Sequence, residues 1–188
     1  MDIYIYLYGI FIHTVFIINY IINIYESKSK NLNIAIFTFI LGHITIIVNL
    51  IRHILSHGNE NNLVFDDQLT IAGITGHGFL SASILMQIFI FRNMKLDFMR
   101  IIFLLGQLGM IMLYKYVYEL DKYKEIHINK FRLLYILVPC LIIFYTKEFF
   151  IANNNITKII FLMMTMVYIN WVIFILYLTK NKKYTFLN

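Results

Sequence analysis

The chain has 188 residues, of which 60% are hydrophobic and 14% are charged, and its mean hydropathy is +0.73. A soluble domain of this size is usually about half apolar, with about a quarter of its residues charged, so the composition excludes an ordinary soluble protein. The net charge of +6 lies in the polar segments between apolar runs, and it gives no reason to expect a nucleic-acid partner.

Six long apolar runs follow one another along the chain. Because a bilayer core about 30 Å thick needs about 20 apolar residues per spanning helix, each run is long enough to cross a membrane. The predicted spans are residues 3–25, 34–55, 69–91, 101–119, 131–151 and 157–179. None shows the ten-residue alternation of barrel strands, so we predict an all-α, polytopic membrane helix bundle. The linkers are short and polar, and residues 1–188 are expected to form a single membrane domain.

The first run follows Met1 and Asp2 without a basic segment and without a small-residue cleavage site. It is therefore expected to be a retained helix and not a signal peptide. Ile and Phe abound beside only four alanines and one proline, which indicates an AT-rich genome: an organelle, a giant virus, or an AT-rich bacterium or protist. The single cysteine, Cys140, excludes an internal disulfide and a cysteine metal cluster.

Histidines stand deep in the first three predicted spans, as His13, His43 and His77. Because the unperturbed pKa of histidine lies near 6.5, His77 and His43 are candidates for a proton relay. Two histidines from different helices can ligate a haem iron, but the spacing indicates no pairing, so no cofactor is predicted and a b-type haem protein stays an alternative. His53 and His57 lack acidic or cysteine neighbours, so no metal site is predicted there and they are expected to face lipid headgroups.

The third run, LTIAGITGHGFLSASILMQIF at residues 69–89, holds three of the chain's eight glycines. Glycine in a membrane helix either lets another backbone approach closely or permits a break in the helix. Gly73, Gly76 and Gly78 surround His77, and this pattern favours a broken or distorted helix that lines a polar cavity. Tight packing alone is the alternative interpretation.

The fourth run ends in YKYVYEL, where Lys115 and Glu119 stand four residues apart on one helix face. This spacing permits a buried ion pair or a proton-accepting pair, and ionisable groups inside a membrane are candidates for function. The alternative is a lysine that extends to the membrane interface. Lys147 and Glu148 are expected at an interface.

Motifs of soluble catalysis are missing: the sequence has no HExxH, no GxSxG and no Walker loop. No catalytic residue is therefore nominated, and the sequence leaves open whether the chain belongs to an enzyme.

The third run resembles a conserved stretch of the antiporter-like, proton-pumping membrane subunits of respiratory complex I, and most closely the second-subunit-like members. The matching residues are Leu69, Thr70, Ala72, Gly73, Ile74, Gly78 and Phe79. The flanking runs, LNIAIFTFILGHITIIVNL and GQLGMIMLYKYVYEL, are similar to the helices that flank the broken helix in that family. The family's paired prolines are replaced by Thr75 and Gly76, and its earlier helices have no counterpart in these residues.

The resemblance implies a membrane-arm subunit of mitochondrial NADH:ubiquinone oxidoreductase that takes part in or supports proton translocation. Its place would be the mitochondrial inner membrane, with other membrane subunits and lipids as partners and with redox chemistry elsewhere. Lys115 would then titrate, with Glu119 as its partner and His77 and His43 as relays. The alternatives are a structural or assembly subunit of another respiratory complex and a small stand-alone transporter. Burial of Lys115 near another ionisable group would favour transport, and exposure to headgroups would favour a structural role.

Overall fold

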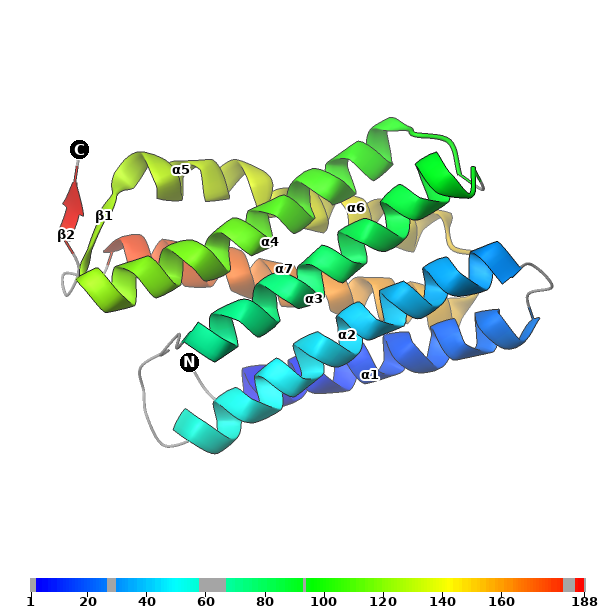
Figure 1. Cartoon of the computed structure of the whole chain (residues 1–188), viewed down its shortest axis with the longest axis horizontal. Coiled ribbons are helices and arrows are strands. Elements are labelled where there is room, and N and C mark those ends of the chain that lie inside the picture. The colour runs from blue at the N-terminus through cyan, green and yellow to red at the C-terminus, as the bar shows by residue number, and fades with distance from the viewer. Residues whose placement is uncertain (1–2, 27–29, 58–66, 93, 181–184, 188) are drawn as a thin grey trace.

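The computed structural model describes residues 3–26, 30–57, 67–92, 94–180 and 185–187, and helices make up nearly all of this part (Figure 1). The elements, in chain order, are α1 (Ile3–Glu26), α2 (Lys30–His57), α3 (Asp67–Leu85), a π-helical segment η1 (Met86–Ile90), α4 (Phe98–Tyr123), β1 (Glu125–His127), α5 (Ile128–Leu137), α6 (Pro139–Ile151), α7 (Asn155–Lys180) and β2 (Thr185–Leu187). The predicted all-α helix bundle is confirmed. The two short strands pair in parallel.

Five helical segments in the described part of the chain are long and apolar enough to cross a membrane. They are Asn33–Leu55, Thr70–Ile90, Phe98–Leu120, Ile128–Ile151 and Asn155–Lys180. At a rise of 1.5 Å per residue, segments of this size are roughly 30–40 Å long, which matches a bilayer core. In α1 the described apolar stretch, Tyr6–Ile22, is shorter. Five of the six predicted spans thus meet the length criterion.

The span predicted at residues 131–151 is two consecutive helices, α5 and α6, which meet at Val138. Pro139 follows at the first position of α6, where its missing N–H removes one hydrogen bond of the helical ladder. Two glycines of α4 face this junction. A Cβ added at Gly109 would lie 2.6 Å from Leu137, and one added at Gly106 would lie 2.4 Å from Leu141. The junction is therefore packed directly against the backbone of α4.

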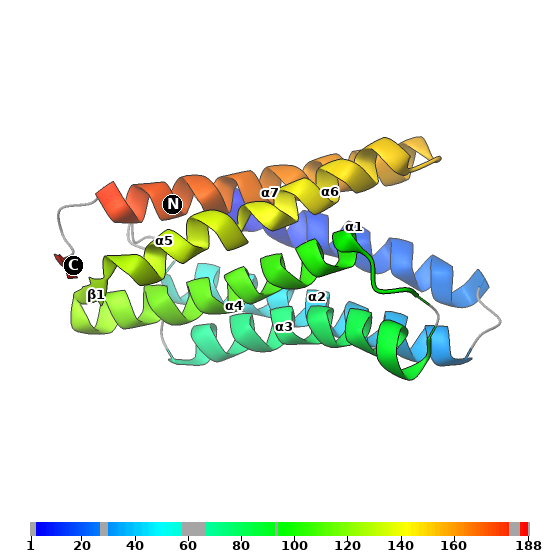
Figure 2. The same cartoon turned by 90° about the horizontal axis from the view of Figure 1, so that it is seen from above.

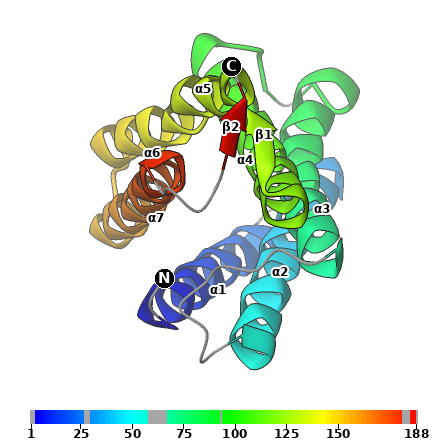
Figure 3. The ribbon, with the colours of Figure 1, turned by 90° about the vertical axis from the view of Figure 1, so that its left-hand side faces the viewer.

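The helices form a ring when the bundle is viewed along its length (Figure 3). In order around the ring, α1 packs on α2, α2 on α3, and α3 on α4. Helix α4 packs on both α5 and α6, and α7 packs on α6 and closes the ring against α1. Figure 2 shows α5 and α6 in line beside α4 and α7. Because every main helix has a neighbour on each side, one face of each helix is directed into a shared interior.

The crossing of α2 and α3 places two glycines in contact. A Cβ added at Gly42 would lie 2.9 Å from the carbonyl oxygen of Gly76, and one added at Gly76 would lie 3.1 Å from that of Gly42. Small residues permit this close approach of membrane helices. The expected break around Gly76 is wrong, because α3 runs without interruption from Asp67 to Leu85 and no described glycine has a positive φ. The distortion lies further on, in η1.

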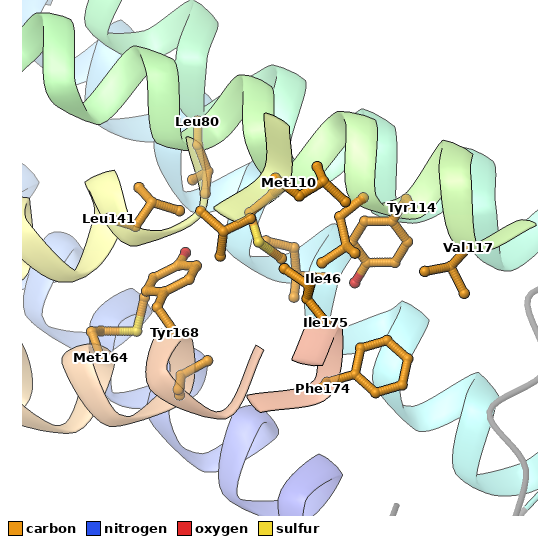
Figure 4. Packing of buried hydrophobic residues seen from close by; sticks show 14 of the residues in the cluster. Ile46, Leu80, Met110, Tyr114, Val117, Leu141, Met164, Tyr168, Phe174 and Ile175 are labelled. Atoms are coloured by element: carbon orange, nitrogen blue, oxygen red, sulfur yellow. The ribbon is translucent and has the colours of Figure 1, made fainter. Parts of the chain in front are cut away.

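Apolar side chains fill the interior and also cover the outside of the bundle. Figure 4 shows Tyr114 of α4 and Tyr168 of α7 with their hydroxyl oxygens inside the apolar cluster. On the outside, Leu55, Ile136 and Phe150 are more than two thirds exposed. Large apolar side chains are stable in such positions when they face lipid, so the outer surface fits a membrane-embedded bundle.

Candidate functional site

A pair of histidines lies at the centre of the α1–α2 contact. The Nδ1 atoms of His13 and His43 are 2.6 Å apart, and both side chains are buried. At this separation one nitrogen carries the hydrogen and donates it, while the other accepts. Aromatic rings enclose the pair: Phe16 stacks on His43 with ring centroids 5.2 Å apart, and Phe39 packs edge-on at 4.9 Å. The two imidazoles are thus held in contact and shielded by apolar rings.

His77 of α3 makes a second buried contact. Its Nδ1 lies 2.7 Å from Oε1 of Gln107 on α4, and both side chains are buried. A carbonyl oxygen only accepts, so Nδ1 of His77 carries the hydrogen and Nε2 is left as the basic nitrogen of the ring. His77 is also close enough to His13 and His43 to interact with them electrostatically.

Glycines place His77 at this position. On α3 the buried residues Gly73, Gly76, His77 and Leu80 share one helix face, as their three- and four-residue spacing requires. A Cβ added at Gly73 would lie 2.3 Å from the ring of Tyr114, so the missing side chain gives α4 its room. Gly78 has nothing within 4 Å of such a Cβ. Two of the three glycines therefore serve close packing beside His77, which was the alternative interpretation of the sequence.

Two buried tyrosines, on α6 and α7, extend the cluster of polar side chains from Gln107 toward α6. The rings of Tyr145 on α6 and Tyr168 on α7 stack with centroids 5.5 Å apart and planes 8° apart, and both are almost fully buried. Tyr168 lies close enough to interact with both Gln107 and Tyr145. Neither hydroxyl has a hydrogen bond of good geometry to a residue that the structure describes, and the same holds for Nε2 of His43 and Nε2 of Gln107.

These six side chains, here called the polar network, come from six different helices. They are His13 (α1), His43 (α2), His77 (α3), Gln107 (α4), Tyr145 (α6) and Tyr168 (α7). In hydrocarbon a polar group without a partner costs several kcal/mol, so a cluster of this kind is costly to place inside a membrane bundle. Its groups each donate or accept hydrogen bonds, and three of them are imidazoles.

An inner cavity lies on one side of the polar network. Its volume is about 30 Å³, and its polar lining includes His13, His77, Tyr168, Tyr114 and Asn170. A site needs roughly 10–15 Å³ of this kind of volume for each water molecule, so the cavity has room for one or two. Residues from the first half of α1 also line it, so it lies toward the end of the bundle where α1 begins.

An outer cavity lies on the other side, toward the connections η1–α4 and α6–α7. Its volume is about 500 Å³, and its lining reaches from Tyr145 to the charged residues Asp97, Arg100, Lys147 and Glu148. Since Tyr145 lines the outer cavity and its stacking partner Tyr168 lines the inner one, the tyrosine pair separates the two spaces. Asp97 caps α4 by accepting from the backbone N–H of Arg100, and this hydrogen bond lowers the pKa of its carboxyl group.

The predicted pair on α4 lies apart from these groups. The Lys115 side chain is 62% exposed, its Nζ lies 3.9 Å from Oε1 of Glu119, and it lines neither cavity. Glu119 is also held by Lys130 of α5, whose Nζ is 3.2 Å from Oε2. The structure therefore brings His77 and His43 together and leaves Lys115 and Glu119 on the surface of the chain.

The histidine arrangement also bears on the haem alternative. Two ligands of one iron need nitrogens about 4 Å apart with the metal between them, whereas His13 and His43 are in direct hydrogen-bonding contact. The described residues contain no group of three or more His, Cys, Asp or Glu side chains placed to hold a metal. His53, expected to face headgroups, is instead buried, with its ring centroid 4.5 Å from that of Tyr6; the side chain of His57 lies outside the described residues.

Four members of the polar network were not predicted from the sequence as proton-pathway candidates: His13, which was noted only as lying deep in its span, and Gln107, Tyr145 and Tyr168. Gln107, Tyr145 and Tyr168 stand in apolar runs without any local motif, and only the folded ring of helices brings them beside the histidines. No protein-family model, no curated protein and no solved structure matches this chain. Its chemistry is therefore inferred from the contacts described above.

Proposed function

We propose that this chain transfers protons through the membrane along the polar network. The observation that carries the proposal is the arrangement itself: buried imidazoles, an amide and two stacked tyrosines lie between two cavities on opposite sides of the bundle centre. Ionisable and polar side chains inside membrane helices usually mark such pathways. The exposure of Lys115 does not favour transport through that lysine, so the proposal gives its role to the buried histidines.

The histidines and tyrosines on the path each exchange one proton for another, whereas the amide of Gln107 does not titrate and orients His77. A tyrosine hydroxyl accepts a proton on its oxygen and releases its own, and an imidazole takes up a proton at one nitrogen and releases one from the other. Gln107 fixes the tautomer of His77, which leaves Nε2 to take the proton from water in the inner cavity. One proton is taken up at one cavity and one is released at the other, and no electron is transferred.

Proton flux into liposomes tests this proposal. The purified chain is reconstituted with a trapped pH-sensitive dye, and a potassium diffusion potential drives protons inward. Wild-type protein should acidify the interior faster than protein-free liposomes. Tyr168→Phe removes one hydroxyl of the pathway and should reduce the flux at least tenfold. Tyr135→Phe is the matched control, because the hydroxyl of Tyr135 bonds Thr179 outside the polar network; it should leave the flux unchanged. Equal flux in both variants would refute the pathway.

We further propose, from the resemblance at residues 69–79 alone, that the chain works inside complex I of the mitochondrial inner membrane. Native gels of gently solubilised membranes test this, with mass spectrometry to identify the band that contains the chain. Co-migration with NADH dehydrogenase subunits supports membership. Migration with another respiratory complex would favour the structural or assembly subunit, and migration alone would favour a stand-alone transporter.

A further inference from the structure

We propose that the outer cavity is a binding site for a neutral, flat ring compound that carries a hydrogen-bond acceptor such as a carbonyl oxygen. Its size is the first reason. A relay of protons needs only a file of waters, whereas this cavity holds about 500 Å³, against about 30 Å³ on the inner side. Cavities of roughly 300–1,000 Å³ are those that bind small organic molecules.

The lining of the cavity favours a ring. Six aromatic side chains from five helices face it: Tyr20, Phe39, Phe103, Phe144, Tyr145 and Phe161. Several already pack edge-on or tilted against one another, such as Phe103 with Phe144 at 4.8 Å and Phe144 with Tyr145 at 5.2 Å. Aromatic rings in these orientations bind a further flat ring by stacking or edge contacts. An acyl chain would gain apolar contact there but no stacking or edge contact with the rings.

A buried donor defines the inner end of the site. The Tyr145 side chain is 1% exposed, and its hydroxyl interacts with Tyr168 but has no hydrogen bond of good geometry within the described residues. An acceptor oxygen on the ligand would take this hydrogen and relieve the cost of burying it. The buried side chain of Gln87 also lines the cavity and adds an amide.

The charges of the cavity favour a neutral ligand. Arg100 and Lys147 are balanced by Asp97 and Glu148, and Arg100 is already paired with Asp97. An anionic headgroup would meet as many carboxylates as cations. A neutral ring with an acceptor can reach the site from two sources. Ring compounds that carry an alkyl tail dissolve in the membrane, and ring compounds without a tail come from water.

Calorimetric titration of the chain in phosphatidylcholine nanodiscs tests the site, with empty nanodiscs as the blank. The probe is chromone, a neutral bicycle with one carbonyl group, and naphthalene is the same size without an acceptor. Chromone should bind more tightly than naphthalene. The substitution Tyr145→Phe should weaken the binding of chromone roughly three- to tenfold and leave the binding of naphthalene unchanged. Ile84→Phe adds a ring to the cavity lining and should abolish binding, whereas Leu85→Phe adds the same ring on the exposed face and should not.

Chromone bearing a dodecyl tail distinguishes the two sources. Tighter binding than chromone, beyond the gain seen for empty nanodiscs, supports a ligand from the bilayer, and equal binding supports one from water. Heat no greater than that of empty nanodiscs, or chromone binding unchanged in both Ile84→Phe and Tyr145→Phe, would overturn the proposal. Since these titrations measure no proton movement, their result is independent of the flux experiment.

Discussion

The glycines of α3 allow the packing of the bundle to be tested one methyl group at a time. In Gly73→Ala the new Cβ would stand 2.3 Å from the ring of Tyr114, and in Gly76→Ala it would stand 2.7 Å from Ile46. Ordinary contacts begin near 3.4 Å, so a buried ring must move by about 1 Å. Overpacking of this kind lowers the free energy of unfolding by about 1–3 kcal/mol. The better helix propensity of alanine offsets about 1 kcal/mol of that loss.

Gly78→Ala is the matched control, because nothing lies within 4 Å of its added Cβ. It gains the propensity without the clash and should stabilise the bundle by about 0.5–1 kcal/mol. Gly73→Ala, after the same gain in propensity, should lower the free energy of unfolding by about 1 kcal/mol, and by about 2 kcal/mol if the Tyr114 ring cannot move. The assay is denaturation in mixed micelles, followed through the fluorescence of Trp171, the single tryptophan. If Gly78→Ala were as destabilising as Gly73→Ala, the glycines would be needed for backbone freedom, and the close-packing account would be refuted.

Two further predictions concern charged side chains near the ends of α4. The hydrogen bond from the backbone N–H of Arg100 lowers the pKa of Asp97 below its ordinary 3.8, so its contribution to stability is present above that pH and is lost as the pH falls through the lowered pKa. Asp97→Asn keeps an N-cap but should remove this pH dependence from melting temperatures measured between pH 2 and pH 7. If the melting temperature of Asp97→Asn fell at low pH as much as that of the wild type, the prediction would be wrong. Lys130→Ala breaks the half-exposed pair with Glu119 and should change the free energy of unfolding by less than about 1 kcal/mol, and a larger loss in the same micelle assay would show a buried role.

The sequence predicts the helices because the apolar length of a membrane span is a local property. The limits of this prediction show at Val138, because the run at 131–151 was predicted as one span although Pro139 within it divides that span into two helices. They show again at Met86–Ile90, where a π-helical segment replaces the break expected at Gly73–Gly78.

The candidate site was predicted in part, for a physical reason. A buried histidine in an apolar run is conspicuous, so His43 and His77 could be named from the sequence. Tyr145 and Tyr168 cannot be told from the chain's other tyrosines until the ring of helices is assembled. The spacing of Lys115 and Glu119 is the same for a buried pair and for a surface pair. Only the packing of α4 against α3, α5 and α6 shows that its lysine is outside.

The central claim is that protons follow the buried histidines and not the surface lysine, and one comparison of proton flux in liposomes tests it. The account predicts that His77→Phe abolishes the flux while Lys115→Gln leaves it at the wild-type rate, with both proteins inserted to the same extent. Loss of flux in Lys115→Gln together with normal flux in His77→Phe would contradict the account and return the pathway to the face of α4 that carries Lys115 and Glu119.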